Sequence, residues 1–119
     1  MRLSMPGLLL RLEGAAVLTL AVFLYTRLGG GWLLFAALIL APDLAMLGYL
    51  VNVGVGSAVY NLIHTYVVPA GLLAFAWLSD ATLGILVAFI WFAHIGADRM
   101  LGFGLKYPTE FKDTHLNRV

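Results

Sequence analysis

The sequence predicts an all-α fold: a transmembrane four-helix bundle in up-down-up-down order, with short loops and a cytoplasmic C-terminal tail. Two observations predict this fold. The chain of 119 residues is 62% hydrophobic and only 11% charged, whereas soluble domains carry about 25% charged residues, so its surface has to face lipid. The apolar residues also gather in four runs, each close to the ~20 residues that a helix needs to cross the hydrocarbon core.

The four runs are continuously apolar, which favours helices over the alternating strands of a membrane β-barrel. Short breaks rich in Gly, Asn, Ser and Asp separate them, as is typical of turns. Loops this short make consecutive helices antiparallel. We therefore expect a single integral membrane domain over residues 1–119, with helices at 8–28, 32–51, 56–78 and 82–103 and a tail at 104–119.

The first run is predicted to be a retained helix and not a signal peptide. The apolar region of a signal peptide covers only about 7–15 residues and precedes a small-residue cleavage site. Here the run is longer, contains Glu13, and ends in Tyr25-Thr26-Arg27 without such a site.

The distribution of basic residues predicts the orientation of the chain. Of the seven Lys and Arg residues, all except Arg27 fall on the side that holds both termini. The positive-inside rule then places both termini in the cytoplasm, and Tyr25, Trp32 and Trp77 at the outer membrane interface. A net charge of +1 without a basic stripe excludes nucleic acid as a partner. The absence of cysteine excludes disulfides and thiolate metal sites.

Five ionisable side chains within the predicted helices are expected at one depth. At 1.5 Å per residue, Asp43, His64 and His94 lie about 12 to 13 Å from the cytoplasmic ends of their helices, and Asp98 about 8 Å. Glu13 lies near the cytoplasmic start of the first helix. A charge at bilayer depth is costly and is retained mainly where it finds a partner or serves a function. The sequence therefore predicts a polar site in the cytoplasmic half.

The residue types at this depth are those of a zinc, manganese or iron site. His94 and Asp98 are spaced i, i+4 and share a helix face. Pro42 and Pro69 are expected to interrupt their helices close to Asp43 and His64, as happens where membrane backbone lines protein or a cavity. Alternatively, the His and Asp side chains only join helices through hydrogen bonds. The candidate metal ligands are His64, His94, Asp98 and His115, and the candidate general bases are Asp43 and Glu13.

Four polar motifs follow in order: Pro42-Asp43-Leu44, Tyr60-Asn61-Leu62-x-His64-Thr65-Tyr66, Trp91-x-Ala93-His94-Ile95-Gly96-x-Asp98-Arg99, and Lys106-Tyr107-Pro108-Thr109-x-Phe111-Lys112-Asp113-Thr114-His115. With these motifs the chain resembles an uncharacterised bacterial four-helix integral membrane family, a domain of unknown function. The resemblance implies a small multi-pass protein of the bacterial inner membrane. It supplies no activity, and it extends the site to Asp113 and His115. A looser likeness to membrane-embedded metal-dependent hydrolases rests on residue types alone and is an analogy.

Two functions from different classes follow. The first is a metal-dependent hydrolase that acts on a lipid or amphiphile from the cytoplasmic leaflet. The alternative is a non-catalytic accessory or structural subunit, bound to a membrane-protein partner or to a second copy, so whether the protein is an enzyme stays open. Haem or chlorin ligation by His64 and His94 is disfavoured by the nearby carboxylates. A proton or ion pathway is disfavoured because the outer half offers it no continuation.

Overall fold

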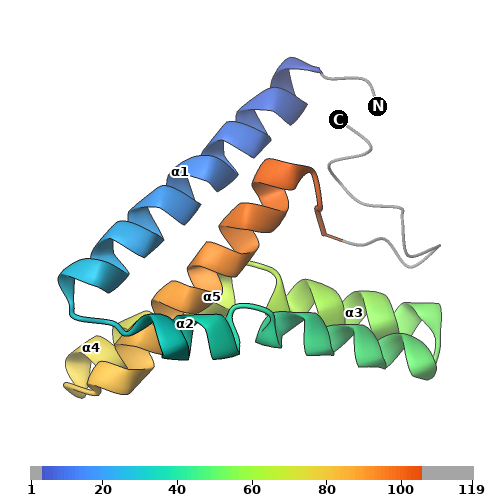
Figure 1. Cartoon of the computed structure of the whole chain (residues 1–119). Helices are drawn as coiled ribbons and strands as arrows, with labels where there is room; N and C mark the ends of the chain where they lie inside the picture. The colour runs from blue at the N-terminus through green and yellow to red at the C-terminus, as the bar shows by residue number, and fades with distance from the viewer. Residues whose placement is uncertain (1–3, 106–119) are drawn as a thin grey trace.

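The structure is a computed structural model that describes residues 4–105 of the chain. This part of the chain is helical and contains no strand, which confirms the predicted all-α class. In chain order the elements are α1 (Met5–Arg27), α2 (Trp32–Leu38), the 3₁₀ helix η1 (Ala41–Leu50), α3 (Val53–Ile63), α4 (Val67–Leu78) and α5 (Thr82–Leu101) (Figure 1).

These elements form four segments that are each long and apolar enough to cross a membrane, which confirms the number of predicted spans. Large apolar side chains such as Leu33 and Leu78 point outward from them. The chain is therefore a multi-pass membrane protein whose surface suits contact with lipid. The four spans are Met5–Arg27, Trp32–Leu50, Val53–Leu78 and Thr82–Leu101. Their up-down order across the membrane and the cytoplasmic tail stay predictions.

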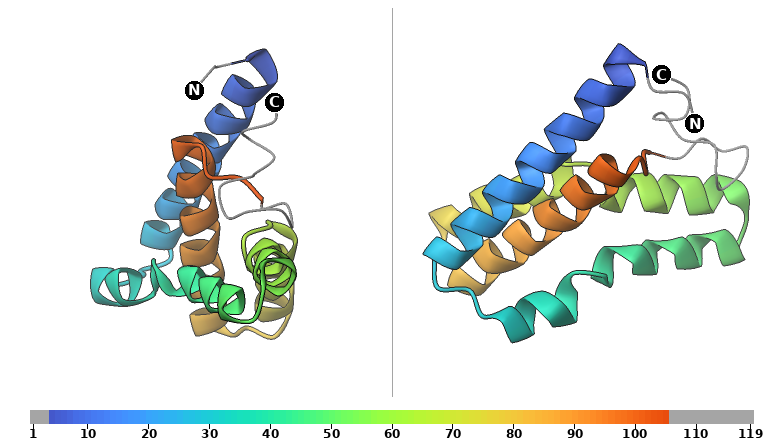
Figure 2. Two further views of the ribbon diagram at one scale, coloured as in Figure 1. Left: turned by 90° about the vertical axis from the view of Figure 1, so that its right-hand side faces the viewer. Right: turned by 45° about the horizontal axis from the view of Figure 1, so that its top comes forward.

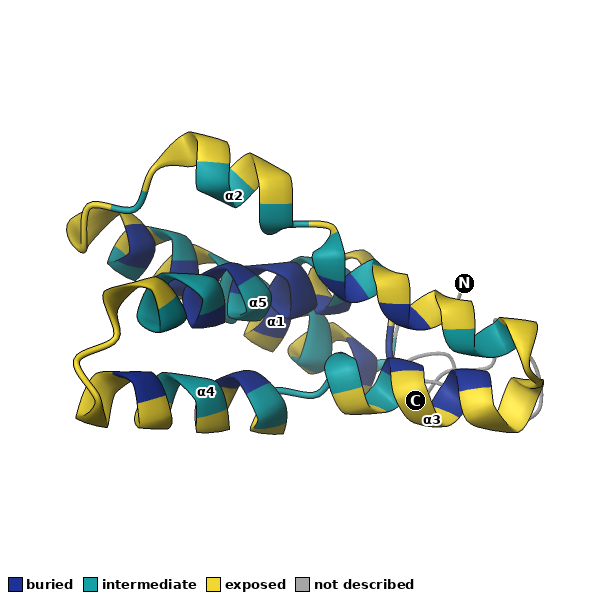
Figure 3. Cartoon of the chain, turned by 90° about the horizontal axis from the view of Figure 1, so that it is seen from below, coloured by how far each residue is buried: buried dark blue, intermediate teal, exposed yellow. Residues whose placement is uncertain are grey.

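The last span, α5, is the centre of the molecule. Both α1 and α4 pack along it, while η1 pairs with α3 in a hairpin that extends beyond the other helices (Figures 1 and 2). Phe89, Ile90 and Ala93 of α5 form the core with Ala21 and Tyr25 of α1. Buried positions accordingly concentrate on α5 (Figure 3). Side chains from α5 can therefore reach every other span.

The contact between α1 and α5 depends on two glycines. A Cβ atom added to Gly96 would lie 2.7 Å from the carbonyl oxygen of Gly14, and a Cβ on Gly14 would lie 2.7 Å from that of Gly96. Small residues let membrane helices approach in this way.

The second and third spans are both broken, so the bounds of the predicted helices need correction. The second leaves the α-helix after Leu38 and continues as the 3₁₀ helix η1, and the third breaks over residues 64–66. Pro42 and Pro69 account for the breaks, because proline lacks an N–H and its ring clashes with the carbonyl four residues earlier. The interruptions predicted at these two prolines are confirmed.

Contrary to the prediction, the side chain of Tyr25 is not part of a lipid-facing aromatic belt. Its side chain is fully buried, its hydroxyl donates a hydrogen bond to the Gly31 carbonyl, and its ring packs edge-on against Phe35 with 5.5 Å between centroids. Tyr25 therefore closes the α1–α2 turn from inside. Trp32 and Trp77 are exposed, as expected of interfacial residues.

Candidate metal centre

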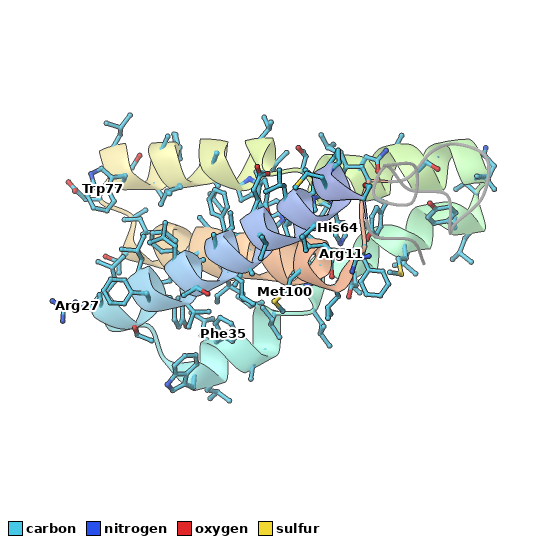
Figure 4. The ribbon with its side chains drawn as sticks, turned by 90° about the horizontal axis from the view of Figure 1, so that it is seen from above. Arg11, Arg27, Phe35, His64, Trp77 and Met100 are labelled. Atoms are coloured by element: carbon cyan, nitrogen blue, oxygen red, sulfur yellow. The ribbon has the colours of Figure 1, made fainter. Side chains whose placement is uncertain are left out.

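Four side chains from three parts of the fold meet at the breaks. Asp43 comes from the first turn of η1, His64 from the break between α3 and α4, and His94 and Asp98 from α5. One nitrogen or oxygen atom from each lies within 4.8 Å of all the others. We call these four residues the His/Asp group. His64 lies in the half of the molecule away from Arg27 and Trp77 (Figure 4).

The distances within the His/Asp group are those expected between ligands of one ion. The two Nε2 atoms lie 3.2 Å apart. Asp43 Oδ1 lies 3.3 Å from His64 Nε2 and 3.1 Å from His94 Nε2. Asp98 Oδ2 lies 3.6 and 3.2 Å from the same two atoms. A tetrahedron around zinc, with Zn–N bonds of about 2.0–2.1 Å, has edges of about 3.3–3.4 Å.

Both histidines turn a lone pair toward the centre of this group. His64 Nδ1–H donates to the Tyr60 carbonyl at 2.9 Å, and His94 Nδ1–H donates to the Ile39 carbonyl. A carbonyl can only accept, so each neutral ring carries its proton on Nδ1 and leaves Nε2 as an acceptor. Such hydrogen bonds fix the tautomer and ring orientation of metal-binding histidines.

With both histidines neutral, the His/Asp group therefore brings together four acceptor atoms without a donor among them. Asp98 Oδ2 is buried and has no hydrogen-bond partner within residues 4–105. Buried acceptors without donors are costly. A cation, or protons taken up by the group, would satisfy them, and a metal ion would satisfy all four at once.

The breaks and the His/Asp group depend on each other. At the break in the second span, Asp43 N–H donates to the Leu40 carbonyl at 3.0 Å, which leaves the Ile39 carbonyl for His94. At the break in the third span, Trp91 Nε1–H donates to the Ile63 carbonyl at 2.7 Å. Backbone carbonyls at membrane depth need such partners. Side chains of α5 thus satisfy the carbonyls that the breaks release.

Arg99, at the end of α5, also donates to a backbone carbonyl at a break. Its guanidinium is buried, donates to the His64 carbonyl at 3.0 Å, and lies over the Tyr66 ring at 5.8 Å from the centroid. When both histidines are neutral, its single positive charge opposes the two carboxylates of the His/Asp group. The Arg99 charge therefore lies beside the His/Asp group, next to His64.

The His/Asp group is closed on one side and open on the other. The side chains of His64 and His94 are almost fully buried, Asp98 is 18% exposed, and Asp43 is 36% exposed. The Tyr60 ring stacks on His64 with centroids 3.8 Å apart and 7° between the planes. A molecule from outside would therefore meet Asp43 first.

The remaining candidate residues lie elsewhere. Glu13 is exposed on α1 and is not part of the His/Asp group. His115 and Asp113 lie outside the described residues. The sequence analysis assigned no role within the site to Trp91, Tyr60 or Arg99, although all three stand in the same motifs as the ligand candidates.

These features define a class: a multi-pass membrane protein with four apolar spans and a His/Asp group that could hold a metal ion. Residues 7–119 match the model of a family described as Domain of unknown function (DUF4260). The chain belongs to this family, which confirms the resemblance to a membrane family of unknown function. No curated protein and no solved structure matches the chain, so function has to be inferred from the site itself.

Proposed function

We propose that the protein is a membrane-embedded, metal-dependent hydrolase of a lipid or amphiphile, and that His64, His94 and Asp98 hold a divalent ion. The observation that carries this proposal is the convergence of four acceptor atoms at the spacing of metal ligands. Two histidines and one carboxylate form a ligand set of catalytic zinc sites, in which a fourth position is left for water or substrate. A bound divalent ion would make hydroxide available near neutral pH.

Asp43 is the proposed general base. It is the most exposed member of the His/Asp group, and its Oδ1 lies within 3.3 Å of both histidine Nε2 atoms. A carboxylate in this position can accept a proton from a water molecule beside the ion. Arg99 holds the break in place through the His64 carbonyl and so positions the histidine ring.

The alternative role is structural. If Asp43 binds the ion as a fourth ligand, the site becomes a closed four-ligand site of the structural type. The ion would then brace η1, the α3–α4 break and α5 in a non-catalytic subunit of a larger membrane complex. The similar distances from both aspartates to the histidines favour this reading.

Orientation and extent complete the proposal. We infer one membrane domain over residues 1–119 in a bacterial inner membrane, with both termini in the cytoplasm. The basic residues support this orientation, since only Arg27 falls on the other side. A substrate would then come from the cytoplasmic leaflet.

The metal content of the protein in lipid nanodiscs tests the proposal. We expect about one equivalent of zinc, manganese or iron by elemental mass spectrometry, and its loss in His94→Ala, because removing one ligand opens the site. Asp80→Asn is the matched control. Asp80 lies exposed in the α4–α5 turn at φ 53°, a conformation that asparagine tolerates and alanine does not. A folded protein that binds no metal would overturn the proposal.

Asp43→Asn separates the two roles. As a general base, Asp43 is dispensable for metal binding, so we expect the variant to keep its metal and lose hydrolysis of ester or amide amphiphiles. As a fourth ligand, it contributes to affinity, so metal content would fall with it. Metal content and hydrolysis measured on one preparation therefore decide between enzyme and structural subunit.

A further inference from the structure

We propose that the apolar cavity beside the His/Asp group binds the alkyl chain of a single-chain amphiphile whose polar head lies at the group. This inference names the substrate class of the proposed function and rests on it. The cavity has a volume of about 280 Å³ and is lined by apolar side chains, among them Leu38, Pro42, Ile63, Ile90 and Trp91. Its size is near the lower end of small-molecule sites, about 300–1,000 Å³, which suits one chain and not several.

Three of the lining residues are close neighbours in the chain of members of the His/Asp group. Pro42 precedes Asp43 in the chain, Ile63 precedes His64, and Ile90 stands one turn before His94. The lining itself is apolar, and the chain passes from each of these lining residues to Asp43, His64 or His94 within one helical turn. Among residues 4–105, the His/Asp group is therefore the expected partner for the polar end of a bound molecule.

The order of cavity and group along α5 matches an amphiphile in one leaflet. Val87 and Ile90 line the cavity and precede His94 by seven and four residues. At 1.5 Å per residue they lie about 10 and 6 Å further from the C-terminal end of α5. With that end at the cytoplasmic face, the cavity lies toward the bilayer centre and the group toward the headgroups. A lipid-like molecule has its tail and head in the same order.

The walls of the cavity are held in place by the contacts that build the site. The Trp91 indole is fixed by its hydrogen bond to the Ile63 carbonyl. Pro42 has a fixed φ, and it stands in the first turn of η1, directly after the break. The breaks that release carbonyls for α5 thus also shape the cavity.

Photo-crosslinking tests the inference directly. The probe is a fatty acid with a diazirine in its alkyl chain, added to the full-length protein in phosphatidylcholine nanodiscs, and adducts are mapped by mass spectrometry. We expect adducts to concentrate on Ile63 and Trp91. In Ala41→Phe the new ring should fill the cavity and exclude the alkyl chain. We expect the yield of adducts on Ile63 and Trp91 to fall about tenfold, which corresponds to a loss of binding at the low end of the usual overpacking cost. Adducts on Phe75, an exposed residue of α4, should not change.

Two further variants keep the test decisive. Ala36→Phe adds the same ring to an exposed position of α2 and should leave the adduct pattern unchanged. Val87→Phe fills the cavity from α5 and should repeat the effect of Ala41→Phe, so a folding defect in one variant does not end the test. Two results would overturn the inference. One is an adduct yield that depends only on how exposed each residue is; the other is adducts that persist on Ile63 in both Ala41→Phe and Val87→Phe.

Metal content measured on the same samples separates this inference from the proposed function. Bound metal with adducts spread over the exposed surface rejects the alkyl-chain site and keeps the metal centre. Adducts confined to the cavity in a protein without metal keep the alkyl-chain site and reject the hydrolase.

Discussion

At His94, ring orientation depends on a backbone carbonyl that is available only because the second span is broken. The Ile39 carbonyl would otherwise accept the Asp43 N–H, which donates to Leu40 instead. Partners of this kind commonly change metal affinity 10–100-fold when they are lost. The local backbone of one span thus determines which nitrogen of a histidine on another span can bind a metal.

Trp91→Phe tests the role of the break-stabilising hydrogen bonds. The variant keeps an aromatic wall but removes the donor to the Ile63 carbonyl, so we expect a loss of about 1–3 kcal/mol of stability from the unpaired acceptor. Thermal unfolding in detergent, followed by circular dichroism, measures the change. Trp77→Phe is the control, because Trp77 is exposed on α4. Equal effects from the two variants would contradict the role assigned to Trp91.

At this scale the sequence predicts which residues gather but not how they face one another. Depth along a helix follows from residue number, and it placed Asp43, His64, His94 and Asp98 together. Rotation about the helix axis depends on tertiary packing, so the tautomers and the carbonyl partners could not be predicted. Arg99 shows the limit, because its place in the sequence predicts only that it lies on the side of the termini, whereas the structure buries it against the His64 carbonyl.

Among the elements, α5 differs from its neighbours because it completes their hydrogen bonding. Its side chains Trp91, His94 and Arg99 each donate to a carbonyl of a broken span. The four spans were predictable from apolar runs and turn residues. The 3₁₀ conformation of η1 was not, because Pro42 predicts an interruption without specifying the backbone that follows it.

Gly96→Ala tests the contact of α1 with α5. The new methyl group would meet the Gly14 backbone, so we expect a loss of about 1–3 kcal/mol from overpacking. Gly71→Ala is the control, and we expect it to raise stability, since no neighbouring atom lies within 4 Å of the added group. Alanine in place of a mid-helix glycine should gain about 0.5–1 kcal/mol there. Reversible unfolding in mixed micelles measures both, and a gain in Gly96→Ala would contradict the close contact.

For the whole molecule, the main untested feature is its orientation in the membrane. The α1–α2 and α4–α5 turns lie at one end of the molecule and the η1–α3 turn at the other (Figure 2). The basic residues predict that this second end faces the cytoplasm. The proposed metal site does not depend on this orientation. The orientation decides only from which leaflet a substrate would reach the site.

Cysteine labelling tests the orientation cleanly, because the chain has no cysteine of its own. Ser79→Cys lies in the α4–α5 turn and Val51→Cys in the η1–α3 turn, both at exposed positions. We expect a membrane-impermeant maleimide to label Ser79→Cys in intact cells and Val51→Cys only after lysis. The reverse pattern would invert the topology.

The dependence of two broken spans on α5 has a consequence for biosynthesis. Spans leave the ribosome in chain order, so the segments that contain Ile39, Ile63 and His64 are made before α5 exists. Their released carbonyls would face hydrocarbon if these segments entered the lipid alone. The nascent chain therefore has to keep its second and third spans in a polar or protein-lined environment until the fourth arrives. The ligands on α5 then reach the site last, so all four residues of the His/Asp group can meet around a metal only after the fourth span has been made.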